Sequence, residues 1–160
     1  MEDLLNKESV KRVLKVLNDF DQSIKVQNLD TTARTAKDAA ESLKTEIGSI
    51  VKSLLLKRQS SFLLCLVAGD KRCSLNKIKK ILGQKDVSMG NADQAKEVTG
   101  FTIGGVSPVG HLNPLKIYID KSLSRFKNIY GAAGHPNCVF KINFENLQKI
   151  TNGEVSDIAE

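Results

Sequence analysis

The sequence predicts a single α+β domain in which one curved, mixed β-sheet, partly closed like a barrel, is flanked by helices. Its 160 residues fit one domain. Apolar residues make up 41% of the chain and aromatic residues 5%, so the core must consist mainly of Ile, Leu, Val and Ala. Predicted strands do not alternate regularly with predicted helices, which favours a mixed sheet. We expect residues 1–160 to form this domain, with residues 152–160 as a tail.

Helices are predicted where apolar residues recur at helical spacing behind a capping residue. In the first, the apolar residues between 10 and 17 form one stripe, and Ser9 is the candidate cap. In the second, small alanines between 36 and 40 form a narrow stripe that must pack closely on another element. The predicted helices, with their caps, are 9–19 (Ser9), 35–43 (Thr35), 74–83 (Ser74 and Gly83), 91–98 (Asn91 and Gly100) and one that begins at Asn143.

Strands are predicted from period-two alternation or from short apolar runs between turn residues. The run 61–67 is almost entirely apolar, so we expect it at the centre of the sheet. Residues 100–114 contain four Gly and two Pro, which predicts an ordered loop. The other predicted strands are 23–29, 47–56, 86–89 and 115–120, and residues 127–142 are expected to form strand, glycine-rich turn and strand.

Charge and cysteine content limit the environment and the partners. The net charge of +6 suits a polyanionic partner, such as a nucleic acid. No apolar stretch approaches the length of a membrane helix, and the N-terminus lacks the apolar segment of a signal peptide, so we expect a cytoplasmic protein without a membrane partner. The three cysteines form no C-x-x-C pair and are predicted to be structural, with Cys65 in the core.

Lys52 interrupts the apolar stretch "IVKSLLLKR" (50–58). Strand alternation places Ile50, Lys52 and Leu54 on one face, so the lysine shares that face with large apolar side chains. In one interpretation, Lys52 lies on an edge strand, and its stem covers apolar surface while its ammonium reaches water. In the other, it lies in the wall of a pocket, where it supplies a positive charge or, if desolvated, has a lowered pKa.

Two glycine-rich segments are further candidate sites. In "GGVSP" (104–108), adjacent glycines free the backbone to turn N–H groups toward a ligand, Ser107 adds a hydroxyl and Pro108 stiffens the exit. The same segment is equally compatible with a tight connection between strands. In "GAAGHPN" (131–137), His135 stands in an exposed turn, where a lone histidine is either solvated or functional.

Several enzyme classes lack their signatures in this sequence. There is no G-x-G-x-x-G or Walker pattern for a nucleotide phosphate, and no G-x-S-x-G elbow of a serine hydrolase. His111 and His135 have no metal-ligand spacing with a cysteine or carboxylate, so we expect no metal and no cofactor. The basic run 71–80 is either a solvated face or a track for a phosphate backbone.

Three motifs follow one another in a specific order: "KSLLL" (52–56), "GGVSPVGH" (104–111) and "GAAGHPN" (131–137). In that order they resemble the YbaK/prolyl-tRNA synthetase editing-domain family. Any one of them would be weak evidence, whereas the ordered set is specific. The likeness extends over most of the chain and includes "LVAGDKRCSLNKIKKILG" (66–83), "IYIDKSL" (117–123) and the closing "SDIA" (156–159).

The resemblance implies a YbaK-like domain of the free-standing kind. It implies a hydrolase that cleaves the ester joining a wrong amino acid to tRNA, with the acceptor end of mischarged tRNA as partner and an aminoacyl-tRNA synthetase as a further candidate partner. Carried over residue by residue, Lys52 matches the family's essential lysine, Gly104, Gly105, Ser107 and Pro108 match its glycine-rich substrate loop, and Gly134 and His135 match its second pocket loop.

An aminoacyl ester is already activated, so its hydrolysis needs a positioned water and a stabilised oxyanion rather than a triad. We expect the amides near Gly104 and Gly105 to face the ester carbonyl, while Lys52 holds the terminal adenosine or the carbonyl oxygen. Small residues, Ala132 and Ala133, would limit the size of the pocket. The predicted catalytic residues are Lys52, Gly104, Gly105 and His135, and the predicted substrate-binding residues are Ser53, Val106, Ser107, Pro108, Ala133 and Gly134.

The sequence departs from the cysteinyl-tRNA(Pro) deacylase type, which has a threonine after the lysine and a "GGKRG"-like second loop. Here the corresponding residues are Ser53 and "GAAGHPN". The substrate therefore stays open among small amino acids, such as Ala, Ser, Thr or Cys, on tRNA(Pro) or another tRNA. Two competing interpretations are a non-catalytic tRNA- or synthetase-binding module with the same fold, and a lysine-dependent Schiff-base enzyme.

Overall fold

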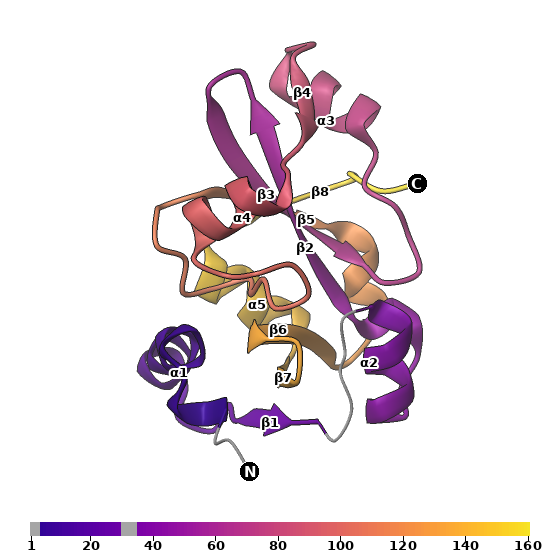
Figure 1. Ribbon diagram of the computed structural model, residues 1–160. Helices are drawn as coiled ribbons and strands as arrows, with labels where there is room; N and C mark the ends of the chain where they lie inside the picture. The colour runs from indigo at the N-terminus through magenta and orange to yellow at the C-terminus, as the bar shows by residue number, and fades with distance from the viewer. Residues whose placement is uncertain (1–3, 30–34) are drawn as a thin grey trace.

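The computed structural model describes residues 4–29 and 35–160. In these residues two β-sheets are surrounded by helices (Figure 1), which confirms the predicted mixed α+β fold, although the strands divide into two sheets rather than one. The α-helices are α1 (Glu8–Phe20), α2 (Ala36–Leu43), α3 (Leu75–Leu82), α4 (Ala92–Thr99) and α5 (Phe144–Thr151), and the 3-10 helices are η1 (Leu4–Asn6), η2 (Ile47–Ser49) and η3 (Lys121–Arg125). The strands are β1 (Val26–Asn28), β2 (Val51–Arg58), β3 (Ser61–Ala68), β4 (Val87–Met89), β5 (Lys116–Asp120), β6 (Ile129–His135), β7 (Cys138–Ile142) and β8 (Glu154–Ser156).

The larger sheet has the strand order β4-β2-β3-β5-β8. As its apolar run predicts, β3 lies at the centre, antiparallel to β2 and parallel to β5. The register pairs Lys52 with Val67 and Ser53 with Leu66. Because successive side chains on a strand point to opposite faces, Lys52 and Ser53 of β2 point to opposite faces of this sheet.

The smaller sheet has the order β1-β7-β6, and all its pairs are antiparallel. A parallel bridge between Ile50 and Tyr130 joins it to the start of β2. A register shift between Ala132 and His135 marks a bulge in β6. Such a bulge bends its strand and raises its local twist.

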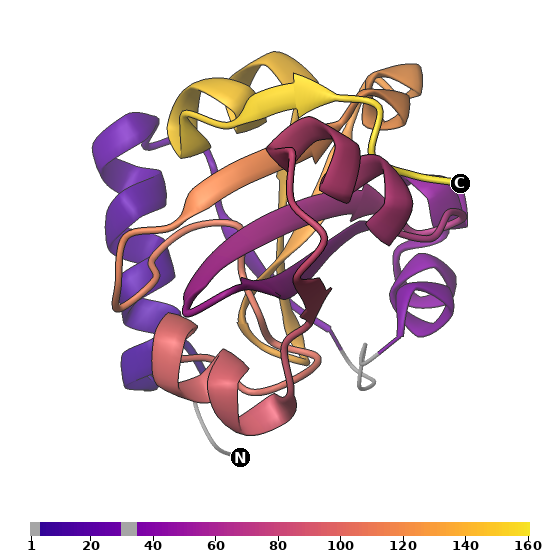
Figure 2. The same cartoon turned by 90° about the horizontal axis from the view of Figure 1, so that it is seen from above.

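Each face of the larger sheet carries its own apolar core. On one face, Leu64 and Leu66 of β3 pack in a cluster that includes α1. On the other, Cys65 and Val67 pack in a cluster that includes α3, which confirms Cys65 as a core residue. Figures 1 and 2 accordingly show α1 and α3 on different sides of the strands. No helix in the described part of the chain has the length and apolar character needed to cross a bilayer.

Most of the predicted helix caps are confirmed. The hydroxyl of Thr35 accepts the Asp38 N–H, and the hydroxyl of Ser74 accepts the Lys77 N–H. The Asn91 and Asn143 side chains cap α4 and α5 in the same way, and Gly83 and Gly100 end their helices in the left-handed conformation. The alanine stripe of α2 packs as predicted, in a cluster with Ile50, Val139 and Leu29.

Ser9 is not a helix cap, contrary to the prediction. The helix begins one residue earlier, with Lys7 at the cap position and no capping hydrogen bond from its side chain. Ser9 instead lies inside α1, where its hydroxyl donates to the Gly134 carbonyl at 2.9 Å. This long-range bond ties α1 to β6, and local sequence rules for caps contain no information about it.

Three further segments differ from their predictions. Residues 47–49 form the 3-10 helix η2 rather than the start of β2. The glycine-rich residues 131–135 belong to β6, and the turn lies after them. The expected tail, 152–160, contributes β8, which pairs in parallel with β5, and it buries Ile158 completely. The Ile158 N–H also donates to the Asp120 carboxylate at 3.0 Å.

We predict that Ile158→Ala lowers the free energy of unfolding by about 2–5 kcal/mol, because it leaves a cavity in the core beneath α3. Urea unfolding followed by circular dichroism measures the change. Ile81→Ala on the exposed side of α3, where Ile81 is 41% exposed, is the control and should change stability by less than about 0.5 kcal/mol. Equal, small effects of both changes would mean that the C-terminal residues behave as a free tail.

Candidate functional site

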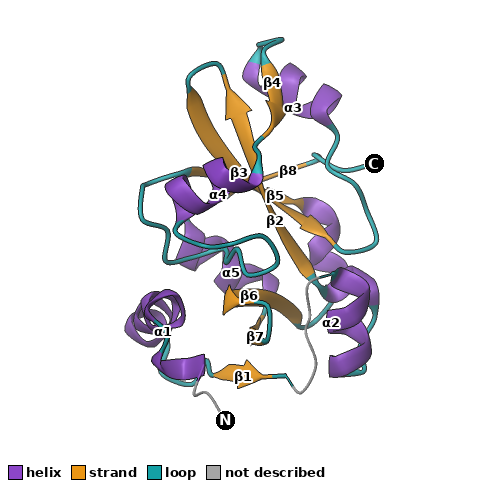
Figure 3. Cartoon of the chain, viewed as in Figure 1, coloured by secondary structure: helices purple, strands orange, loops and turns teal. Residues whose placement is uncertain are grey.

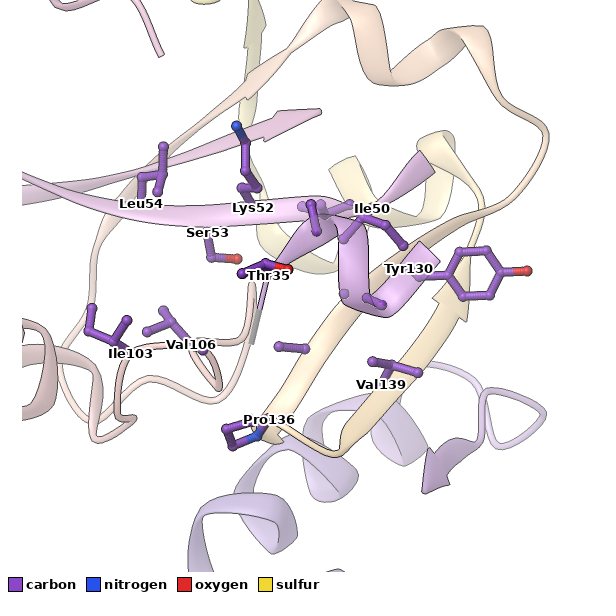
Figure 4. Close-up of a pocket in the computed structure, with 16 residues that line it drawn as sticks. Thr35, Ile50, Lys52, Ser53, Leu54, Ile103, Val106, Tyr130, Pro136 and Val139 are labelled. Carbon is purple, nitrogen blue, oxygen red and sulfur yellow. The ribbon is translucent and has the colours of Figure 1, made fainter. Parts of the chain in front are cut away.

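A cavity of about 330 Å³ lies between the start of β2, the start of α2, the loop after α4 and the β6–β7 hairpin (Figure 4). It therefore occupies the space between the two sheets. Its walls are mainly apolar and come from segments far apart in the sequence. The lining residues are Thr35, Ala36, Ala39, Ile50, Val51, Lys52, Ser53, Leu54, Ile103, Gly104, Val106, Tyr130, Gly131, Ala132, Pro136 and Val139.

Ser53 carries the polar group that faces this cavity from β2. Figure 4 shows its hydroxyl on the side of the strand that faces Ile103 and Val106. The Ser53 Oγ is buried and has no hydrogen-bond partner among the described residues. A buried hydroxyl without a partner is costly, so this atom is available to a polar group that enters the cavity.

The Lys52 ammonium points the other way. Figure 4 shows Lys52 and Leu54 on the same side of β2, opposite Ser53. Lys52 Nζ donates a hydrogen bond to the Lys71 carbonyl in the turn after β3. Burial lowers the pKa of Lys52, and the negative charge of Asp70 opposes that shift. Lys52 therefore lines the cavity, and its ammonium lies beside the turn after β3.

The glycine loop, residues 100–111, follows α4 (Figure 3), and its residues Ile103, Gly104 and Val106 line the cavity. Within it, Gly104 has a φ of 92° and lines the cavity. The Gly105 N–H donates to the Thr102 carbonyl at 2.9 Å, so this amide is used inside the turn. By contrast, the Gly104 N–H has no partner among the residues that the structure describes. Of the two predicted oxyanion donors, Gly104 lines the cavity, whereas the Gly105 N–H is already bonded to Thr102.

Ser107 and Pro108 belong to the glycine loop but lie behind the residues that line the cavity. Ser107 is fully buried, its hydroxyl accepts the Val109 N–H at 3.2 Å, and its carbonyl lies 2.7 Å from His111 Nε2. Pro108 packs against Gly131, where a Cβ would lie 3.1 Å from the proline ring. These two predicted substrate-binding residues do not line the cavity, and they hold Val106 and Gly104 in place.

Arg12 of α1 holds the same loop in place, although no motif in the sequence marks it as a site residue. Its guanidinium donates to the carbonyls of Gly110 (3.1 Å) and Gly100 (3.0 Å) and lies 4.9 Å above the Phe101 ring. These contacts attach both ends of the glycine loop to α1. An amphipathic helix offers many polar residues, so only the folded chain shows which one makes such contacts.

The second predicted pocket loop contributes differently from expectation. Ala133 is fully buried in the core, and its neighbour Ala132 lines the cavity instead. His135 is half-buried, and its Nδ1 accepts the Asn137 N–H at 3.0 Å. Gly134 has a φ of 90° and lies against α1, where a Cβ would be 2.6 Å from the Ser9 carbonyl oxygen. Gly134 and His135 thus fix the β6–β7 hairpin beside the cavity.

The cavity is also lined by residues that the sequence did not predict as part of the site. Thr35 and Ala36 come from the start of α2, Val51 from β2, and Tyr130 and Val139 from the small sheet. Strand alternation could have found Val51, because it shares the face of Ser53. The others become neighbours only through the bridge between the two sheets, which has no local signal in the sequence.

Comparison with known proteins identifies relatives of this chain. A sequence model of the aminoacyl-tRNA editing domain matches residues 30–150. The uncharacterized protein YwhH of Bacillus subtilis is 28% identical over 92% of this chain and 94% of YwhH. EbsC of Enterococcus faecalis, named as a candidate Cys-tRNA(Pro)/Cys-tRNA(Cys) deacylase, is 27% identical over 78% of this chain and 76% of its own length. The proline–tRNA ligase of Thermosipho melanesiensis is 35% identical over 68% of this chain, which spans 20% of that ligase.

Two solved structures share this fold over nearly all of the chain. A candidate trans-editing enzyme for prolyl-tRNA synthetase has a TM-score of 0.90 and 35% identity, and the match covers 96% of this chain and 98% of that one. The hypothetical protein APE2540 has a TM-score of 0.87 and 26% identity, covering 93% of this chain and 99% of its own. These matches confirm the fold that the resemblance implies.

We predict that Gly134→Ala lowers the free energy of unfolding by about 2–5 kcal/mol, because its Cβ meets α1 and its φ is positive. Gly83→Ala is the matched control: its φ is 65°, but no atom lies within 4 Å of its Cβ. That change should cost only about 1–2 kcal/mol of backbone strain. Urea unfolding of both variants separates the two contributions, and equal losses would mean that α1 does not press on Gly134.

His111 predicts a pH dependence of stability. Because a carbonyl can only accept, His111 Nε2 donates to the Ser107 carbonyl. Burial lowers the pKa of His111 below the ordinary 6.5, while the bond to Ser107 opposes the shift. Below that ordinary value the unfolded chain binds more protons than the folded chain, so the free energy of unfolding falls on acidification.

We expect His111→Gln, whose amide can still donate to Ser107, to reduce this pH dependence between about pH 5 and about pH 7.5. Urea unfolding of both proteins at the two pH values gives the comparison. Equal pH dependence in the two proteins would show that His111 does not titrate as inferred.

Proposed function

The chain belongs to the aminoacyl-tRNA editing-domain family, and from that premise we propose that it hydrolyses the ester bond between a small amino acid and a tRNA that carries it in error. The observation that carries the proposal is the mainly apolar cavity, which lies within the matched residues. It offers a buried hydroxyl from Ser53 on one wall and, on the other, an amide from Gly104 that has no partner in the described part of the chain.

The reaction needs neither a catalytic triad nor a covalent intermediate, because an aminoacyl ester is already activated. The proposed site positions a water for attack and stabilises the oxyanion that develops on the carbonyl. We assign the oxyanion contact to the Gly104 N–H, since the Gly105 N–H is engaged by Thr102. The amino acid enters the cavity, and Val106 and Ala132 restrict the size of its side chain.

We assign Lys52 to the tRNA rather than to the carbonyl. Its ammonium lies on the other side of β2 from Ser53, near the turn that contains Lys71. A cation at this edge of the site attracts phosphates of the tRNA 3′ end as they pass over the strand. Lys71 and Arg72 follow in the same turn and add positive charge there.

His135 takes a supporting role in this proposal. Its ring already accepts a backbone N–H from Asn137, and its own backbone lies against Gly105. We therefore assign it to holding the glycine loop and the β6–β7 hairpin together, which keeps the water and the ester aligned. Its side chain is half-buried beside Pro136, which lines the cavity.

We predict that Lys52→Ala lowers kcat/KM for deacylation of mischarged tRNA about 10–100-fold, the loss expected for one hydrogen bond to a charged group. Lys57→Ala, in the same strand but outside the cavity, is the control and should stay near the parent rate. Lys52→Arg keeps the charge with a different geometry and should lie between them.

The measurement is hydrolysis of a panel of tRNAs, each charged with a different small amino acid. A parent rate for Lys52→Ala would overturn the role assigned to this lysine. No hydrolysis of any ester by the unmodified protein would instead favour the non-catalytic binding module. Borohydride trapping followed by mass spectrometry tests the Schiff-base alternative, for which a stable adduct on Lys52 is the positive result.

A further inference from the structure

The Ser53 hydroxyl is unusual within the described residues. Among them, its Oγ is the buried side-chain nitrogen or oxygen without a hydrogen-bond partner. Other buried hydroxyls are satisfied: Ser49 donates to the Glu46 carbonyl, Thr99 donates to the Ala95 carbonyl, and Ser107 accepts the Val109 N–H. Buried polar groups in native proteins are almost always paired, so an unpaired one needs an explanation.

The described neighbours of this hydroxyl do not supply a partner. Ile103 and Val106, which face it across the cavity, have apolar side chains. The hydroxyl of Thr35 caps α2 by accepting the Asp38 N–H, and no hydrogen bond joins it to Ser53 Oγ. Figure 4 shows the Tyr130 ring directed away from Ser53, with its hydroxyl at the far end. The described residues therefore leave this hydroxyl open to a molecule that enters the cavity.

The order in which the parts of a charged tRNA enter a cavity limits what this partner is. The amino acid is the terminal group of the charged tRNA and reaches the deepest position. The ribose and base to which it is attached stay nearer the mouth of the cavity, with the rest of the tRNA. Ser53 Oγ is buried, so it meets the amino acid first. An ammonium group buried against one hydroxyl would lose much of its hydration, which disfavours the α-amino group as the partner.

We infer that Ser53 is a specificity-determining residue that pairs with the side-chain hydroxyl of a β-hydroxy amino acid, serine or threonine, carried by the tRNA. This inference rests on the proposed function. A serine or threonine ester satisfies the buried hydroxyl, whereas an alanine or 2-aminobutyrate ester leaves it unpaired. The site therefore selects its substrate by a hydrogen bond within apolar walls.

The test compares serine with 2-aminobutyrate, which replaces the hydroxyl by a methyl group of similar size. Each is loaded on the same tRNA(Pro), and kcat/KM for deacylation is measured with the unmodified protein and with Ser53→Ala. We expect the unmodified protein to prefer the serine ester about tenfold and Ser53→Ala to lose that preference. A preference that is unchanged in the variant would overturn the inference, because Ser53 would then meet a group that all aminoacyl-tRNAs share, or a water.

A binding measurement keeps this inference separate from the proposed function. Adenosine that carries serine or 2-aminobutyrate through a 3′-amide is not hydrolysed, and calorimetry gives its Kd directly. If the unmodified protein hydrolyses no ester but binds the serine amide about tenfold more tightly, the hydrolase proposal fails and the Ser53 inference stands. Equal binding of the two amides by the unmodified protein would overturn the inference whatever the hydrolysis rates are.

Stability provides the matched control. Removal of an unpaired buried hydroxyl breaks no hydrogen bond, so Ser53→Ala should keep or raise the melting temperature. Ser49→Ala removes a buried hydroxyl that donates to Glu46 at 2.7 Å, so it should lower the melting temperature and leave the serine preference intact. A marked loss of stability in Ser53→Ala would show that the hydroxyl has a structural partner and would overturn the inference. Ser53→Cys, with a weaker donor, should give an intermediate preference.

Discussion

The close contact between the glycine loop and the β6–β7 hairpin is the constraint on which the cavity depends. A Cβ on Gly105 would lie 3.0 Å from the Cα and the N of His135, and a Cβ on Gly134 would lie 2.6 Å from the Ser9 carbonyl oxygen. Backbone therefore meets backbone at both places, and side chains cannot adjust the spacing. This fixed spacing sets the position of Ile103 and Val106, which form the wall opposite Ser53. The bonds from Arg12 and Ser9 hold α1 against the outer side of the same assembly.

Because side chains alternate between the two faces of β2, two adjacent residues take the two proposed roles of contacting the amino acid and contacting the tRNA. Ser53 faces the cavity, and Lys52 faces the turn after β3, so a single strand presents a neutral hydroxyl inward and a cation outward. This division suits a substrate with two different ends, a small amino acid and a polyanionic nucleic acid. A lysine inside the apolar cavity would carry a large desolvation cost, whereas the observed position lets a main-chain carbonyl accept from its ammonium.

Local signals in the sequence predicted most elements of the fold. Caps such as Ser74 and Asn91 act within one turn of helix, and the apolar run of β3 identifies a central strand without knowledge of its neighbours. The C-terminal strand β8 could not be predicted in this way, because its short, polar sequence forms a strand only beside β5. The division into two sheets depends likewise on the bulge in β6 and on the bridge from Ile50 to Tyr130.

The site was predicted at the level of segments and less well at the level of side chains. Glycine-rich sequences indicate where a backbone closely approaches another part of the protein or a ligand. They therefore predicted that the segments 104–108 and 131–137 belong to the site. Whether a side chain lines the cavity or supports it depends on the register of the folded strands. Ala132 and Ala133 are indistinguishable in the sequence, yet the first lines the cavity and the second lies in the core. Strand alternation correctly separates Lys52 from Ser53, but it cannot tell which of the two faces meets the glycine loop.

Size alone cannot account for selection among small amino acids in this cavity. A wall can exclude a side chain that is too large, but any space that admits serine also admits alanine, and the lost contact of one small group changes affinity only modestly. A cavity lined mainly by apolar residues would therefore treat these substrates almost alike. The buried Ser53 hydroxyl changes this, because the apolar substrate leaves it unpaired while the hydroxyl-bearing substrate satisfies it. In the proposed site, the walls set the upper limit of size and one hydroxyl distinguishes the amino acids below that limit.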